Sequence, residues 1–198
     1  MTDAVLVVAW GALAVDSLLL SRRERHRAAL GPVVAQGWHP RSAVQGPLLA
    51  VAVAEAAVVE VWSGRVYFRP VLALFGLGLV VAGLVLHARA RRALGPFWTG
   101  IVQVRAGQPI VQYGPYARVR HPIYLAVLLL VIGSLAAHVS VATACLAVGL
   151  AAGLALKIRV EERALRGVLG EAYDRYAERV PALVPRWSAP RVSSGTPR

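Results

Sequence analysis

RHPIY, residues 120–124, marks the point where a polar part of this chain gives way to membrane-type sequence. Residues 108–118 before it are rich in polar and aromatic side chains, whereas an apolar run follows it directly and extends to residue 137. Basic and aromatic side chains are costly to keep at the start of such a run without a function. The sequence RVEE, residues 159–162, follows the last apolar run in a similar way. The two clusters together predict a cofactor site at a membrane surface.

The composition is that of an integral membrane protein. Apolar residues make up 57% of the 198 residues and charged residues only 16%, whereas a soluble domain carries more charge. The net charge of +12 would also fit nucleic-acid binding, but the arginines cluster at the ends of apolar runs, where membrane anchoring explains them better. The single cysteine, Cys145, excludes a disulfide framework, and the five histidines show no zinc spacing, so no metal is expected.

Five apolar runs predict an all-α membrane protein with five transmembrane helices. The runs cover approximately residues 4–20, 46–62, 70–87, 122–137 and 139–156, and each approaches the length needed to cross ~30 Å of hydrocarbon. The last two runs are separated by little more than His138, which predicts a helical hairpin over 122–156. Glu55 lies inside the second run and is a candidate for the wall of a substrate cavity, although a structural hydrogen bond is an equal alternative.

The basic residues predict the orientation in the membrane. Arginines gather in the first and third connections and directly after the fifth run, whereas the second connection carries little more than Arg65 and Arg69. Because positive residues stay inside, the N-terminus is expected outside and the C-terminus in the cytoplasm. The composition, with one lysine among 22 basic residues, indicates a bacterial cell membrane. The first run has no basic residue ahead of it and is therefore expected to be a span rather than a cleaved signal peptide.

The sequence after the fifth run predicts a cytoplasmic amphipathic helix. Apolar side chains recur there at spacings of three and four from Leu165 to Tyr176, and Pro181 ends the pattern. Three parts are therefore expected: N-terminal helices on the acceptor side (1–93), a cofactor-binding core (94–187) and a disordered tail (188–198).

Glycines inside the apolar runs have a simpler interpretation than nucleotide binding. Gly76, Gly78 and Gly83 have the wrong spacing for a dinucleotide loop, and no strand precedes them. Packing of helices through small residues is the better interpretation, and the same applies to Gly149 and Gly153 in the fifth run.

The two polar clusters contain the groups that an amino acid ligand requires. His121 next to Pro122 is compatible with a simple helix start, but Arg120 and Tyr124 beside it favour a functional role. Arg159 and Glu162 are three residues apart and would share a helix face. Because arginine binds a carboxylate and glutamate binds an ammonium group, the pair suits an α-amino acid such as S-adenosylmethionine.

These motifs in their order resemble the isoprenylcysteine carboxyl methyltransferase family and its phospholipid N-methyltransferase relatives. The similar text is GPY at 114–116, RHPIY at 120–124, EE at 161–162, LGEAYDRY at 169–176 and RVP at 179–181, so the resemblance covers roughly residues 94–185. It implies S-adenosylmethionine bound on the cytoplasmic side and a lipophilic acceptor from the bilayer. The implied cofactor-binding residues are Gln103, Tyr113, Gly114, Tyr116, His121, Pro122, Tyr124, Arg159, Glu161 and Glu162.

Methyl transfer to an oxygen agrees with these residues. Tyrosine faces stabilise a sulfonium, and Arg120, His121 and Arg159 are the candidate catalytic residues that hold or deprotonate a carboxylic or phenolic acceptor. The expected partners are the bilayer and a lipophilic or prenylated acceptor, without nucleic acid or an obligate protein partner.

Three alternatives remain open. They are a phospholipid N-methyltransferase, an NADPH-dependent sterol-type membrane reductase, and a non-catalytic scaffold or transporter subunit. Sterol-type reductases carry an acidic residue directly after the tyrosine that corresponds to Tyr124, whereas this chain has Leu125 there, which argues against hydride transfer.

Overall fold

The structure is a computed structural model that describes residue 11 and residues 32–36, 70–97, 103–105, 107–137 and 141–185. It is mostly helical, as predicted. Apart from residue 11, the first two predicted spans lie outside the described residues, and so do Glu55, His138 and the tail 188–198. The helices are α3 (Pro70–Leu94), α4 (Pro122–Ala137), α5 (Val141–Leu169) and α6 (Glu171–Arg179), with 3-10 turns η2 (Gly95–Phe97) and η3 (Gly114–Ala117).

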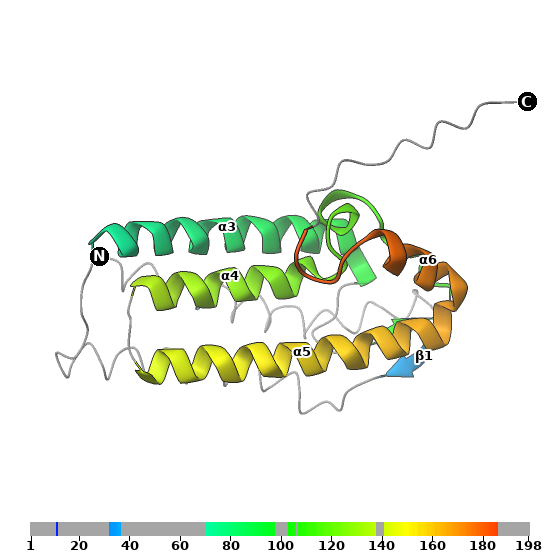
Figure 1. Ribbon diagram of the computed structural model, residues 1–198. Helices are drawn as coiled ribbons and strands as arrows, with labels where there is room; N and C mark the ends of the chain where they lie inside the picture. The colour runs from blue at the N-terminus through cyan, green and yellow to red at the C-terminus, as the bar shows by residue number, and fades with distance from the viewer. Residues whose placement is uncertain are drawn as a thin grey trace, which may run out of the picture.

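The long helices meet the polar elements at one end of the molecule. Figure 1 shows α3, α4 and α5 running side by side, with α6 at the end where α3 stops, α4 begins and α5 stops. Contacts join α3 to α4, α4 to α5 and α5 to α6 in turn. This arrangement brings the start of α4 next to the last turns of α5, although 37 residues separate Tyr124 from Glu161 in the sequence.

Glycines allow α3 and α4 to pack closely, as the sequence predicted for Gly76 and Gly83. A Cβ atom at Gly133 of α4 would lie 2.5 Å from the Gly76 carbonyl oxygen, and one at Gly83 would lie 2.9 Å from the Ala126 oxygen. Val80 and Leu130 between them are fully buried. A Cβ atom added at Gly78, Gly149 or Gly153 would have no neighbour within 4 Å among the described residues, so the packing predicted for these three glycines is not seen there.

Only some of the predicted spans can be compared with the described helices. The segment Val71–Phe97 is long and apolar enough to cross a membrane, and Pro122–Ala136 is a shorter apolar helix. Within the described part of the chain, Val71–Phe97 is the one helix that has both the length and the apolar composition needed to span a membrane. Helix α4 has the predicted bounds, whereas α3 continues seven residues beyond the predicted end at residue 87, because nothing interrupts the helix before Gly95, which has a φ of 57°.

The predicted C-terminal amphipathic helix is divided into two helices. Helix α5 continues without a break from the fifth apolar run to Leu169, and α6 begins at Glu171. Gly170 between them has φ 53° and ψ −136°, a conformation that side-chain-bearing residues rarely adopt. The periodic pattern concealed this break, because Tyr173 and Tyr176 of α6 are also buried.

A short two-stranded sheet was not predicted from the sequence. Strand β1 (Val33–Gln36) pairs antiparallel with β2 (Gln103–Arg105), with an irregularity between Val33 and Ala35. Strands of three or four residues are too short to give a periodic signal. The pairing places the start of the polar segment before α4 close to α5, since both strands contact that helix.

Candidate cofactor site

The backbone around the start of α4 is held by the segment that follows α6. The Arg120 and His121 amides donate to the carbonyl oxygens of Pro181 and Ala182, at 2.9 and 3.0 Å. Pro122 then begins α4, where its missing N–H costs nothing, and it is almost fully buried. This backbone pairing aims the Arg120 and His121 side chains towards α5 and α6.

Glu162 of α5 is the centre of a buried ionic cluster. Its Oε1 accepts hydrogen bonds from Arg120 Nε at 2.9 Å, from Arg120 Nη2 at 2.5 Å and from His121 Nε2 at 3.2 Å. Its Oε2 accepts from Arg166 Nη2 at 3.3 Å. Burial alone would raise the pKa of Glu162, but the hydrogen bonds and charges of His121 and Arg120 outweigh it and lower the pKa to about 2. Glu162 is therefore ionised and already fully partnered.

Arg120 also closes the C-terminal end of α6. Its Nη1 donates to the carbonyl oxygens of Ala177 and Val180 at 2.8 and 2.6 Å, in the region where a helix leaves carbonyl groups without partners. Together with Glu162 these bonds occupy most donors of the guanidinium. The geometry favours a positioning role for Arg120, and its predicted catalytic role stays a prediction.

Glu161 and Tyr124 form a second, more open arrangement beside this cluster. The Tyr124 hydroxyl donates to Glu161 Oε2 at 2.7 Å, and the His121 ring stacks on the Tyr124 ring with 5.5 Å between centroids. Lys157 Nζ lies 5.5 Å from the centre of the same ring. The Glu161 side chain is 30% exposed against 12% for Glu162, so Glu161 is the carboxylate that a ligand can reach.

The turn η3 packs against α3 and is hydrogen-bonded to α6. Gly114 has a φ of 60°, which permits the bend before Pro115, and Tyr116 is buried. The Tyr176 hydroxyl donates to the Tyr116 carbonyl oxygen at 2.7 Å, and burial raises the pKa of Tyr176 to about 12. Burial, and then the negative charge of Glu161, raise the pKa of Tyr116 as well. Both hydroxyls are thus neutral donors at physiological pH.

Two of the predicted residues lie away from this cluster. Arg159 is exposed while Glu162 is buried, so the two side chains do not point to the same side as the spacing of three residues suggested. Tyr113 is also exposed, and its hydroxyl donates to the Ala93 carbonyl oxygen at 2.7 Å. The backbone of Gln103 lies in β2, and its side chain lies outside the described residues.

Sequence reasoning missed Arg166 and Tyr173. Arg166 bonds both Glu162 and Asp174 Oδ1, at 3.3 and 3.1 Å, and so ties α6 to α5. Its guanidinium lies 5.8 Å from the centre of the Tyr173 ring. The spacing of four residues between Glu162 and Arg166 on one helix could have predicted their ion pair. The Tyr173 hydroxyl is buried without a hydrogen-bond partner among the described residues.

The geometry suits a cationic ligand next to aromatic and carboxylate groups. A tyrosine ring that stacks on His121 and a reachable carboxylate on the same side can contact an ammonium or sulfonium group. In the described part of the chain, no group of three His, Cys, Asp or Glu side chains is arranged to hold a metal ion.

Comparison with known proteins agrees with this chemistry. Residues 76–167 match the model of the isoprenylcysteine carboxyl methyltransferase (ICMT) family. The match covers a little less than half of the chain, and it shows that this segment is similar to that family. The match includes all of α4 and both Glu161 and Glu162, and it ends before α6.

Two curated relatives and one solved structure are similar to the chain. The cobalt-zinc-cadmium resistance protein CzcN of Cupriavidus metallidurans is 34% identical, over 67% of this chain and 57% of that protein. Protein-S-isoprenylcysteine O-methyltransferase B of Arabidopsis thaliana is 30% identical, over 56% of this chain and 58% of that protein. The chain thus spans less than three fifths of the length of either relative.

The similar structure is that of the eukaryotic intramembrane Ras methyltransferase ICMT. It matches with a TM-score of 0.58 and 21% identity, over 71% of this chain and 52% of that chain. At this identity the likeness concerns the fold, and it agrees with the predicted all-α membrane architecture.

Proposed function

We propose that this protein is an S-adenosylmethionine-dependent methyltransferase of the membrane. It methylates the carboxylate of an isoprenylcysteine-like group, or a phenolic oxygen, on a lipophilic acceptor. The observation that carries the proposal is the meeting of His121, Tyr124 and Glu161 at the start of α4, inside the segment that matches the family. The name of the Arabidopsis thaliana relative supports an isoprenylcysteine acceptor.

Glu161 and Tyr124 are the residues best placed to hold the methyl donor. The donor supplies a sulfonium methyl group and carries an ammonium group next to its carboxylate. Glu161 is partly exposed and is held by the Tyr124 hydroxyl, so its carboxylate can bind the ammonium group. Glu162 and Arg120 keep His121 in position. The other proposed cofactor contacts come from Gln103, Tyr113, Gly114, Tyr116, Pro122 and Arg159.

The acceptor oxygen requires positive charge near the same point. A carboxylate is ionised at neutral pH and needs only a cation to orient it, whereas a phenol with a pKa near 10 needs a base as well. Arg159 is exposed and can orient an acceptor carboxylate. His121 is the candidate base for a phenolic acceptor. We propose that the acceptor enters from the bilayer and that residues 1–93 form its side of the enzyme, with residues 94–187 as the methyltransferase core.

Calorimetry tests the cofactor first. The solubilised protein is titrated with S-adenosylhomocysteine and, separately, with NADPH. Binding of S-adenosylhomocysteine alone is expected. Binding of NADPH would favour the reductase instead, and binding of neither would favour a scaffold or transporter subunit.

Methyl transfer to three lipids tests the acceptor. Farnesylated cysteine, an alkylresorcinol and phosphatidylethanolamine are each compared with a short-chain soluble analogue. We expect an oxygen acceptor with a long chain to be preferred, because the net charge of +12 on the chain as a whole disfavours a second cationic group beside the methyl donor. Preference for the amine would overturn the oxygen assignment, and equal turnover of the soluble analogues would overturn the bilayer route.

A further inference from the structure

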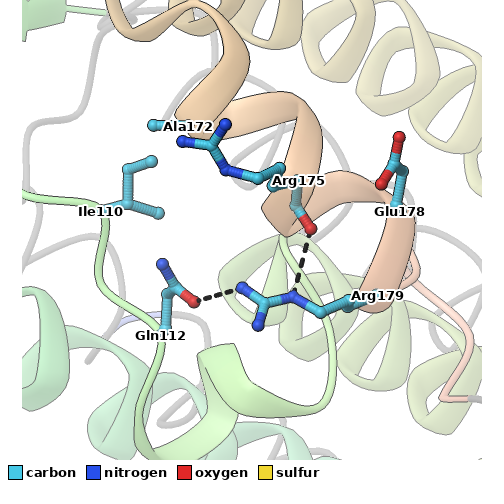
Figure 2. Close-up of a pocket in the computed structure, with 6 residues that line it drawn as sticks. All are labelled: Ile110, Gln112, Ala172, Arg175, Glu178 and Arg179. Carbon is cyan, nitrogen blue, oxygen red and sulfur yellow. Dashed lines mark hydrogen bonds between the residues drawn. The ribbon is translucent and has the colours of Figure 1, made fainter.

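A pocket that the proposed methyltransferase site does not use lies between residues 110–112 and α6 (Figure 2). Its volume is about 430 Å³, which is within the range of small-molecule sites. Its lining consists of Ile110, Gln112, Ala172, Arg175, Glu178 and Arg179. None of these residues contributes to the cluster around His121, Tyr124 and Glu161.

Two arginines on one face of α6 give the pocket its positive charge. Arg175 and Arg179 are one helical turn apart, and Figure 2 shows both guanidinium groups on the side of the helix that faces Ile110 and Gln112. The carboxylate of Glu178, in the same view, points away from Gln112. Two of the three charged residues that line the pocket are therefore cations, and the third is Glu178.

The Gln112 amide adds a neutral donor to these cations. Arg179 Nη2 donates to Gln112 Oε1 at 3.1 Å, and because a guanidinium can only donate, the amide oxygen must face it. The amide nitrogen then faces the other way, and Figure 2 shows it on the side of Ile110 and Arg175. The Arg179 Nε bond to the Arg175 carbonyl oxygen, at 3.1 Å, holds that guanidinium against the helix.

The donors in the pocket are available to a ligand. Arg175 donates to Glu171 Oε2 at 3.2 Å, but these side chains are 66% and 92% exposed. Such exposed pairs contribute little to stability, so a stronger anion can replace the contact. The contact of Arg175 with Glu171 is a single hydrogen bond through Nη1, whereas a guanidinium can bind a phosphate group through two parallel hydrogen bonds.

We propose that this pocket binds a phosphate-bearing anion, held by Arg175, Arg179 and the Gln112 amide. Three donor groups converge on one space whose other lining residues are the apolar Ile110 and Ala172 and the acidic Glu178. The pocket is separate from the methyl-donor site, and it lies on the helix that Arg120 and Arg166 tie to that site. Occupancy would therefore stabilise α6 in its docked position.

Binding of inorganic phosphate and of lipid distinguishes the two sources of such an anion. The full chain in a phosphate-free detergent is titrated with sodium phosphate at constant ionic strength. In parallel, its melting temperature is measured in nanodiscs of phosphatidylglycerol and of phosphatidylcholine. Affinity for phosphate would identify a soluble source, and stabilisation by phosphatidylglycerol alone would identify a lipid headgroup. Absence of both effects would overturn the proposal.

Two variants that remove the same charge at different places show whether the pocket causes the response to phosphate or phosphatidylglycerol. Arg175→Gln/Arg179→Gln should weaken whichever response is observed by about tenfold, because two charge-assisted donors are lost. The control Arg89→Gln/Arg92→Gln removes the same charge from exposed positions on α3 and should leave the response unchanged. Equal losses in the two variants would reduce the effect to bulk charge and contradict the proposal.

A third variant tests the pocket without removing its arginines. Gln112→Glu keeps an oxygen for Arg179 but replaces the amide donor with a negative charge, so it should abolish phosphate binding in a protein that still folds. Unchanged binding in Gln112→Glu would overturn the assignment. S-adenosylhomocysteine binding is measured in the same samples, so a failure of this proposal is separable from a failure of the proposed methyltransferase activity.

Discussion

Glu161 and Glu162 are adjacent in the sequence, yet the helix places their carboxylates in different surroundings. Glu162 is buried among Arg120, His121 and Arg166, whereas Glu161 has the Tyr124 hydroxyl and a partly exposed face. A buried carboxylate with several cationic partners holds the structure together, since removing it leaves uncompensated charges. The neighbouring carboxylate is free to act on a ligand.

Glu162→Gln should destabilise the protein in a pH-dependent way. The pKa of Glu162 falls from 4.5 to about 2 on folding, so its contribution is fully present above pH 4.5 and is lost as the pH falls towards 2. At pH 7 we expect a loss of roughly 3 kcal/mol in the free energy of unfolding. The measurement is the melting temperature of wild type and variant between pH 7 and pH 2.5.

The gap between these two melting curves should close at the acid end. Glu171→Gln is the control, because Glu171 is 92% exposed and should change stability little at any pH. A gap between wild type and Glu162→Gln that stays constant down to pH 2.5 would show that the ionised carboxylate is not the source of the effect.

Tyr124→Phe should weaken binding of S-adenosylhomocysteine while the protein stays folded. The substitution removes the donor that holds Glu161 but keeps the ring that stacks on His121. A hydrogen bond to a charged group contributes about 1.5–3 kcal/mol, so a loss of about tenfold or more in affinity is expected by calorimetry. Ser134→Ala is the control on the same helix, since it removes a hydroxyl that donates to the Leu130 carbonyl oxygen and not to Glu161. Equal affinity of Tyr124→Phe and wild type would contradict the proposed role of Glu161.

The position of helix α6 depends on the backbone conformation of Gly170, which precedes it. Gly170 turns the chain between α5 and α6, and Arg166 and Arg120 then fasten α6 across that turn. The sequence pattern predicted a helix on both sides of Gly170 but not the turn. A periodic stripe reports which residues are buried, and burial of Tyr173 and Tyr176 is compatible with a straight helix or with two helices.

Gly170→Ala should destabilise α6, whereas Gly167→Ala should not. No atom within 4 Å obstructs a Cβ at either position, so the difference comes from the backbone. At Gly170 the positive φ makes an alanine strained by about 1–3 kcal/mol, and in the α5 interior alanine is favoured over Gly167 by about 0.5–1 kcal/mol. Melting temperatures should shift in opposite directions. A stabilised Gly170→Ala protein would show that the turn is not required.

At the scale of the whole molecule, the sequence predicted which residues meet but not how they are paired. RHPIY and RVEE indicated one site, and the structure brings their His121, Tyr124, Glu161 and Glu162 together. Arg159 was grouped with Glu162 on spacing alone. The structure shows instead that Arg120 and Arg166, from two different elements, surround Glu162, which depends on how α4, α5 and α6 cross. Short sequence motifs contain no information on such crossings.

The length of α5 and the positions of the arginines predict how the molecule lies in the membrane. Helix α5 has 29 residues and, at 1.5 Å per residue, is about 43 Å long, which exceeds the ~30 Å hydrocarbon core. Cys145 lies near its first end, and α6 with the proposed cofactor site around His121, Tyr124 and Glu161 lies near the other. Because arginines dominate after the fifth apolar run, we expect that second end in the cytoplasm.

Cysteine labelling in intact cells measures this orientation. In a Cys145→Ser background, Glu171→Cys places one thiol at an exposed position on α6. A membrane-impermeant maleimide should label it only after the cells are permeabilised, because the site must meet S-adenosylmethionine on the cytoplasmic side. Glu178→Cys, also exposed on α6, should behave identically and guards against a local effect of one position. Labelling of both thiols from outside intact cells would invert the topology and would leave the proposed cofactor site without access to its methyl donor.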